Sequence, residues 1–193
     1  NTYNILDYGA VGDASTLNTN AINNAIKDCA AQGGGRVIVP EGVFLTGTIH
    51  LVSHVDLYLE AGSEIKGTHD LDQYVPYVPA DENRGPEHFR WNRALLLGDH
   101  VEEVSISGSG VINGDHVFDP RGEEGMRGPH TILFGASRNV RIKGITINQA
   151  ANYAFMAYQL EDATFTQLNI NAGWDGIHIR WGKNLKISEC SFH

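Results

Sequence analysis

The sequence is short of the features that mark several common protein classes. Its 193 residues include only two cysteines, Cys29 and Cys190, which are too few for a disulfide framework or a zinc site. No run of about 18 apolar residues occurs, so no segment is predicted to cross a membrane as a helix. Basic residues are scarce: the chain has 14 Lys and Arg against 23 Asp and Glu, which gives a net charge of −9. A chain this acidic is a poor partner for nucleic acid, whose phosphates require a basic surface.

The cysteines and the first residue bear on the compartment. Cys29 and Cys190 lie among apolar or helix-type neighbours, which favours two buried thiols, with a disulfide between them as the alternative. No signal peptide is visible, and the chain begins with Asn1 instead of Met. We expect either an excised segment or a mature chain whose leader has been removed.

One helix is predicted, near the N-terminus. Its apolar residues recur at the i, i+3, i+4 spacing of an amphipathic helix. They are Ala21, Ile22, Ala25, Ile26, Cys29 and Ala30. Asn18 or Thr19 is placed to cap its start, and the glycines at 33–35 end it. We expect residues 1–35 to form an N-terminal cap, with the helix 18–31 covering the open end of the fold that follows.

The remainder, residues 36–193, repeats. The segments 139–148, 162–171 and 184–193 align at offsets of 23 and then 22 residues. Alternation with a period of two predicts strands, and the extra residue before the last two columns predicts a bend. The apolar positions fall into four columns: Val140, Ala163, Leu185; Ile142, Phe165, Ile187; Ile145, Leu168, Cys190; Ile147, Ile170, Phe192.

Such columns need a structure in which each residue lies above the one 22 or 23 positions earlier. A right-handed parallel β-helix does this, and its rungs must stack because one rung alone cannot bury its apolar face. An antiparallel sandwich of short strands is the alternative, but it requires no constant offset. The sequence therefore predicts one all-β domain, a solenoid over 1–193 with a capping helix.

Two segments interrupt the repeat and are predicted to be loops on one face. Residues 68–93 are rich in proline and aromatic residues, and residues 114–130 are rich in charge. Insertions into a solenoid often wall its binding face, although merely tolerated surface loops are the alternative. The aromatic residues of the first are Tyr74, Tyr77, Phe89 and Trp91, and the acidic residues of the second include Asp119, Glu123 and Glu124.

Several stretches resemble a known family. Residues 7–13 read DYGAVGD and, with the alanine-rich helix and VIVPEG at 37–42, are similar to the N-terminal cap of pectin-degrading β-helix proteins. Three later stretches follow in order: LTGT at 45–48 with LYLEAG at 57–62, ISGSGVING at 106–114, and NVRIKGITI at 139–147. Together they resemble the polygalacturonase-like glycoside hydrolases of family 28, over essentially the whole chain.

The resemblance implies inverting hydrolysis of galacturonate-containing pectic polysaccharide, without a cofactor. The family draws its catalytic residues from an Asn-Thr-Asp motif, a following Asp-Asp pair, a His-Gly and an Arg-x-Lys. Here WDGIHI at 174–179 resembles the first motif, with Gly173 and Trp174 in the Asn and Thr places. This carries Asp175 over as a catalytic group that helps to activate water. The Asp-Asp pair would fall just beyond His193, so we expect the natural chain to continue and these residues alone to lack the general acid.

The neighbours of Asp175 suit an acidic sugar. Alternation in the segment 177–180 points His178 and Arg180 outward. Arg180 and Lys183 are candidates to bind a sugar carboxylate, because Arg can do so through two hydrogen bonds. A solvated edge is the alternative. His178 stands where the family often has Asp, and we treat it as a candidate substrate contact.

Two aromatic residues complete the expected binding site. Trp174 adjoins Asp175, and Tyr153 lies one rung earlier, where relatives often carry an aromatic that could stack on a sugar ring. Packing in the core, or simple exposure, is the alternative for Tyr153.

Competing functions remain open at this point. Pectate lyases of similar fold bind calcium, but the adjacent Glu161 and Asp162 would point to opposite faces of a strand, so we expect no metal site and no cofactor. A lyase-type elimination catalyst and a non-catalytic sugar-binding or tailspike-like module are the alternatives. For the hydrolase we expect a polysaccharide as the only partner, a monomer at full length, and a secreted or periplasmic location.

Overall fold

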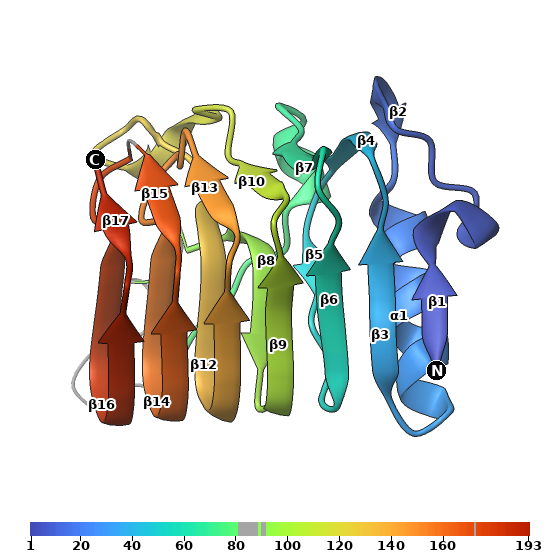
Figure 1. Ribbon diagram of the computed structural model, residues 1–193. Helices are drawn as coiled ribbons and strands as arrows, with labels where there is room; N and C mark the ends of the chain where they lie inside the picture. Colours follow the sequence, from blue (N-terminus) through green and yellow to red (C-terminus); the bar gives the residue numbers. More distant parts are fainter. Residues whose placement is uncertain (81–88, 90–91, 172) are drawn as a thin grey trace.

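Short apolar runs separated by turn residues build strips of parallel strands around one core (Figure 1). The computed structural model describes residues 1–80, 89, 92–171 and 173–193. The chain winds as a right-handed parallel β-helix, in which each rung pairs in parallel with the rung before it. The predicted all-β fold is confirmed.

The strands form two sheets. The larger sheet pairs in the order β1 (Thr2–Asn4), β3 (Gly35–Val39), β6 (Val55–Leu59), β9 (Glu102–Gly108), β12 (His130–Lys143), β14 (Phe155–Thr166) and β16 (Ile177–Ser188), with β8 (Ala94–Asp99) pairing to β12 and to β5 (Ile49–His50). The smaller sheet pairs in the order β17 (Ser191–Phe192), β15 (Asn169–Asn171), β13 (Thr146–Asn148), β10 (Val111–Asn113), β7 (Ser63–Gly67), β4 (Gly42–Thr46) and β2 (Asp13–Leu17).

The strands β12, β14 and β16 bend in the middle, which divides the larger sheet into two limbs. The first limb contains β5 and β8 with residues 130–135, 155–158 and 177–180; the second contains β1, β3, β6 and β9 with residues 140–143, 163–166 and 185–188. Two residues with positive φ form each bend, such as Trp181 (60°) and Asn184 (54°) in β16. This bend was not predicted, because non-glycine residues at positive φ leave little signal in a sequence.

Three of the four predicted columns are confirmed by the strand register. Phe165 pairs with Ile142 on one side and Ile187 on the other, and Ile170 pairs with Ile147 and Phe192 in the same way. Phe165 is completely buried, and its ring meets that of Phe155 edge-on with centroids 4.8 Å apart. The last members of the columns, Ile187 and Phe192, are half exposed because β16 and β17 are edge strands.

The capping helix is confirmed as α1 (Thr19–Ala31), at the N-terminal end of the solenoid (Figure 1). Its apolar face, including Ile22, Ala25 and Ile26, is buried in the main core. Asn18 is the N-cap residue, but its side chain makes no capping hydrogen bond. The side chain instead accepts from the Val11 amide at 2.8 Å, which ties the preceding loop to the helix. The cap also holds a 3-10 turn, η1 (Ile5–Tyr8), and the strands β1 and β2, so both sheets begin before the helix.

Both cysteines are free thiols, so the alternative of a disulfide is not realised. Cys29 is buried on the inner face of α1, as expected. The prediction of a buried Cys190 is only partly right: its side chain is half-buried because it lies just before the edge strand β17.

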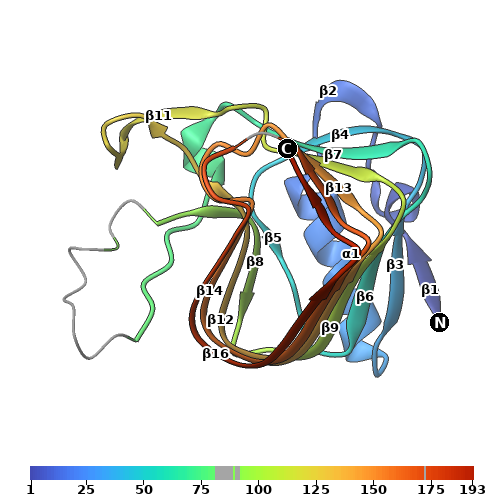
Figure 2. The same ribbon diagram turned by 60° about the vertical axis from the view of Figure 1, so that its left-hand side comes forward.

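The described parts of both insertions lie along the edge where the chain enters the first limb (Figure 2). The first contains a 3-10 turn, η2 (Leu71–Gln73), and places Tyr77 and Phe89 over the outer face of the first limb; Trp91 lies outside the described residues. The second is more regular than the loop we predicted. It contains the strand β11 (Phe118–Glu123), which folds back so that Arg127 bridges to it in an antiparallel manner.

Candidate active site

Asp175 lies in the turn that leads into β16. The turn rests on the rung below, because Ala154 donates its amide hydrogen to the Asp175 carbonyl at 3.0 Å. The Asp175 side chain is 60% exposed, and its Oδ2 atom lies 3.9 Å from Nδ1 of His178. Gly173, where the resembled motif has Asn, takes a φ of 130°. Only glycine adopts this conformation without strain, so an Asn side chain at this position would strain the turn.

Tyr153 lies between two imidazole rings. Its ring stacks on His178 with centroids 5.1 Å apart, and on His130 with centroids 5.2 Å apart. Both faces of Tyr153 are thus in contact with protein, which leaves its edge and hydroxyl for a ligand. Burial raises the pKa of Tyr153, and the negative charges of Glu123 and Asp175 raise it further.

His130 is a site residue that sequence reasoning missed. It is fully buried, and burial lowers its pKa to about 3, with the charges of His178 and Arg127 acting in the same direction. His130 is therefore neutral at ordinary pH and acts as an aromatic support for Tyr153. A lone His at the start of a strand gives no signal of this role, which depends on the rung above.

Arg127 connects the second insertion to the site. Its guanidinium carbon lies 3.9 Å from the ring centroid of Trp174, in a cation–π contact. The same group pairs with Glu124 at 2.9 Å and lies 3.6 Å from Glu123. The buried side chain of Asn152 donates to Glu123 Oε2 at 3.2 Å. Trp174 therefore lies against a fixed cation, and Glu123 is engaged by its neighbours.

Two small hollows flank Trp174. One of about 210 Å³ is lined by Asp175, Gly176 and Phe192, among others. The other, of about 150 Å³, lies between Trp174 and the exposed side chains of Phe118 and Met126 on the second insertion. An exposed carboxylate with apolar and aromatic surfaces beside it is suited to a sugar, which has both polar and apolar faces.

The outer face of the first limb is covered in its middle rungs. Leu97, Leu133 and Met156 point outward in register with His178, yet all three are buried under the first insertion. Tyr77 packs on them and donates its hydroxyl hydrogen to Asp99 at 3.2 Å. It approaches so closely that any side chain at Gly135 would collide with its ring.

The structure brings together four of the six predicted site residues. Asp175, Trp174, Tyr153 and His178 form one cluster. Arg180 follows on the same strand, in register with Tyr158, and its charge affects the pKa of Tyr158. Lys183 is not part of the cluster, because the bend at Trp181 turns it into a separate hollow.

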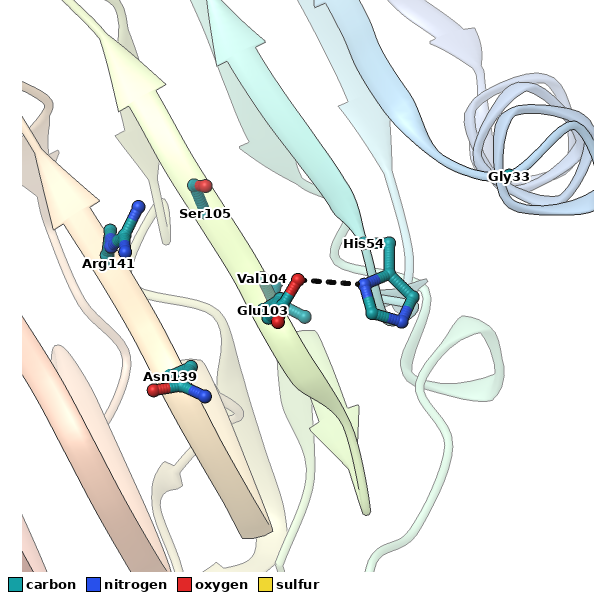
Figure 3. A pocket seen from close by; sticks show the side chains of 7 residues that line it. All are labelled: Gly33, His54, Glu103, Val104, Ser105, Asn139 and Arg141. Carbon is teal, nitrogen blue, oxygen red and sulfur yellow. Dashed lines mark hydrogen bonds and ion pairs between the residues drawn. The ribbon is translucent and has the colours of Figure 1, made fainter.

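Another hollow, of about 490 Å³, lies on the outer face of the second limb (Figure 3). It is lined by polar side chains, including Ser105, Asn139 and Arg141, and His54 pairs there with Glu103 at 3.1 Å. No Phe, Tyr or Trp is among its described lining residues, and its acidic residue is already paired, so it is a weaker candidate than the Asp175 cluster.

Neither a metal site nor a membrane-spanning helix is found among the described residues. No group of three or more His, Cys, Asp and Glu side chains there is placed to hold a metal ion. None of the helices described is long and apolar enough to cross a membrane.

Comparison with known proteins identifies the family. A Vitis vinifera protein named "Probable polygalacturonase" is 32% identical over 201 residues, which cover 96% of this chain and 41% of that protein. The exopolygalacturonase of Thermotoga maritima superposes with a TM-score of 0.76 at 26% identity, covering 100% of this chain and 52% of that one. The family 28 exopolygalacturonase of Yersinia enterocolitica gives 0.83 at 22% identity, covering 98% and 43%.

The chain spans about half or less of the length of these three proteins. The family profile described as "Rhamnogalacturonase A/epimerase, pectate lyase-like" matches residues 2–193, which is almost the whole chain. The chain belongs to this rhamnogalacturonase A/epimerase, pectate lyase-like family.

Proposed function

We propose that this chain forms part of a glycoside hydrolase that cleaves galacturonate-containing pectic polysaccharide with inversion, and that Asp175 helps to activate the attacking water. The observation that carries the proposal is the exposed Asp175 carboxylate beside the Tyr153–His178 stack. The names of the relatives, which are polygalacturonases, support the substrate class. A secreted or periplasmic location of the protein is part of the same proposal.

Inversion requires two carboxyl groups roughly 6.5–9.5 Å apart, one to activate water and one to protonate the leaving oxygen. Asp175 suits the first role because its carboxylate is exposed to water and lies 3.9 Å from the imidazole of His178. Glu123 also lies near Tyr153, but its contacts with Arg127 and Asn152 make it a support for the second insertion. We assign the acid to no residue of the described chain.

Recognition of the sugar carboxylate falls to the outward hydrogen-bond donors of β16. His178 and Arg180 lie on the same face of the strand, next to Asp175. An arginine can grip a carboxylate through two parallel hydrogen bonds, and a protonated histidine adds a third donor. A neutral sugar offers no such partner, so we expect preference for uronic acids.

The covered outer face supports attack at chain ends. A polysaccharide laid along the first limb would meet Tyr77 and the buried side chains beneath it before reaching earlier rungs. The accessible surface thus begins at β16. A site closed on one side takes the end of a chain more readily than its middle, so the proposed mode is exo.

The test uses the protein expressed from its complete gene, with polygalacturonate as substrate. We expect release of reducing ends as short products with little early loss of viscosity, and no change on adding a calcium chelator. A product that absorbs in the ultraviolet, formed only with calcium, would instead establish a lyase. Binding of oligogalacturonides without any turnover would establish a sugar-binding module and overturn the proposal.

A further inference from the structure

A hollow of about 520 Å³ lies outside the bend between the two limbs, away from Asp175. Side chains from three successive rungs line it, including Arg138 from β12, Gln159 and Glu161 from β14, and Trp181 and Lys183 from β16. Its volume lies within the range of about 300–1,000 Å³ typical of small-ligand sites. No residue of the Asp175 cluster takes part in it.

Trp181 gives this hollow an aromatic wall. It is one of the two positive-φ residues of the β16 bend, and the equivalent positions below it carry Ala136 and Gln159. The conformation turns the indole away from the core, and the side chain is 48% exposed. An exposed tryptophan face bordered by polar groups is a surface on which a sugar ring can pack.

The charges around the hollow are mixed: Arg138 and Lys183 are positive, and Glu161 is negative. Arg138 pairs with Glu102 at 2.6 Å, which holds one cation at the rim. Lys183 pairs in register with Glu161, but among the described residues it makes no ion pair. Lys183 is thus available to a ligand in a protein whose net charge is −9.

The hollow continues the candidate active site along the same strand. Arg180 lies between them, and its guanidinium carbon is 5.1 Å from the ring centroid of Trp181. Asp175, His178, Arg180, Trp181 and Lys183 therefore follow one another along β16 and the turn before it. A ligand that extends from Asp175 across the strand would reach Trp181 next.

We propose that the hollow formed by Trp181, Lys183 and Gln159 is an accessory binding site for an acidic sugar of the same polysaccharide. The indole carries the sugar ring and Lys183 binds its carboxylate. This rests on the proposed function for the identity of the sugar, while the site itself rests on the contacts around Trp181. Only oligosaccharides long enough to leave the Asp175 cluster would occupy it.

The experiment measures binding of galacturonate oligomers, from the dimer to the hexamer, to the chain by titration calorimetry. We expect Trp181→Ala and Lys183→Gln each to weaken hexamer binding about 5-fold, as for loss of one aromatic or cationic contact, and to leave the dimer unchanged. Trp181→Phe should keep most of the affinity. Lys186→Gln on the same strand and Arg141→Gln in the second-limb hollow are matched controls that should change nothing (Figure 3).

Separate variants at the Asp175 cluster keep the two proposals distinct. If Tyr153→Ala and His178→Ala abolish dimer binding while Trp181→Ala and Lys183→Gln leave the hexamer unaffected, the accessory site is overturned and the proposed function stands. A second outcome would separate the proposals in the other direction: Trp181→Ala and Lys183→Gln weaken hexamer binding, the Tyr153 and His178 variants leave dimer binding unchanged, and no substrate is hydrolysed. In that case the proposed function fails and the hollow remains a binding site. If no oligomer binds, both are overturned. Unchanged thermal unfolding shows that each variant is folded.

Discussion

The ring of Tyr153 lies almost parallel to the imidazole of His178, with 10° between the planes and 5.1 Å between the centroids. The opposite face of Tyr153 rests on His130, so three rings from successive rungs form one column. The column holds His178 beside Asp175 without any hydrogen bond between their side chains. The site is therefore positioned by stacking, and its support extends to a histidine that no solvent reaches.

The buried His130 predicts a dependence of stability on pH. Its pKa is about 3 in the folded protein, against about 6.5 in an unfolded chain. Between these values the unfolded state binds the extra proton, so the free energy of unfolding falls as pH falls, by up to about 1.4 kcal/mol per pH unit. Urea unfolding at about pH 7 and about pH 5 measures this slope. We expect His130→Gln to flatten it and His116→Gln, at an exposed histidine, to leave it unchanged; equal slopes in all three proteins would refute the assignment.

The repeat made much of the fold predictable. Residues such as Phe165 and Ile142 fall into columns because the offset between rungs is fixed and alternate side chains face the core. The proximity of Asp175 and His178 was equally accessible, since both lie in one short segment. Sequence order alone thus predicted the core and the proximity of two residues of the candidate site.

The repeat does not predict where the two insertions pack on the solenoid. Alternation predicts that Leu133 and Met156 face solvent, yet the first insertion buries both. The contact between Arg127 and Trp174 joins an insertion to a turn two rungs later, and no local pattern specifies it. Lys183 was expected near Asp175, but the positive φ of Trp181 turns the strand first.

The core prediction concerns Phe165. Its side chain is completely buried between rungs, against Phe155, so removing the ring leaves a cavity that the stacked strands cannot close. We expect Phe165→Ala to lower the free energy of unfolding by about 3–5 kcal/mol, measured by denaturant titration. Phe118→Ala, at an exposed position of β11, serves as the control and should cost much less. Equal losses in the two variants would contradict the columnar packing.

The helix α1 should be indispensable because it covers the first rung. Ile26 is buried against that rung, whereas Asn24 on the other face is exposed. A carboxylate at position 26 would be buried without a partner, so we expect Ile26→Asp to aggregate, as deletion of residues 1–35 should. Asn24→Asp adds the same charge in water and should remain monodisperse in light scattering. A soluble, folded deletion variant would show that the helix is not a cap.

The edge strands at the other end predict self-association. Leu185, Ile187 and Phe192 are 37%, 51% and 50% exposed there, beside the unpaired backbone groups of β16 and β17. Open parallel edges with apolar side chains pair readily with other chains. We expect the apparent mass of the 193-residue chain to rise with concentration, and Ile187→Lys to suppress the rise. Phe118→Lys, which charges an exposed apolar position away from the edge, is the control, and suppression by it would point to a different surface.

The last prediction concerns turnover, and it depends on how the carboxylates of the site are engaged. General acid–base assistance is worth about 10²–10⁴-fold per group, so hydrolysis needs both an activating base and a free acid. Asp175 is exposed and suited to the first role, but Glu123 and Glu124 are each paired with Arg127, and Asp119 is buried. We therefore expect the 193-residue chain to bind oligogalacturonides without measurable release of reducing ends.

In the protein expressed from the complete gene, Asp175→Asn should lower kcat at least about 100-fold. It should change affinity little, because the amide keeps the shape of the carboxylate. Asp162→Asn is the control, because Asp162 is exposed at the bend of β14 between the two limbs, and this variant should keep full activity. Turnover by the 193 residues alone would mean that one of the engaged carboxylates is released when substrate binds. Glu123→Gln would then abolish activity, and the acid would lie on the second insertion instead of outside the described site.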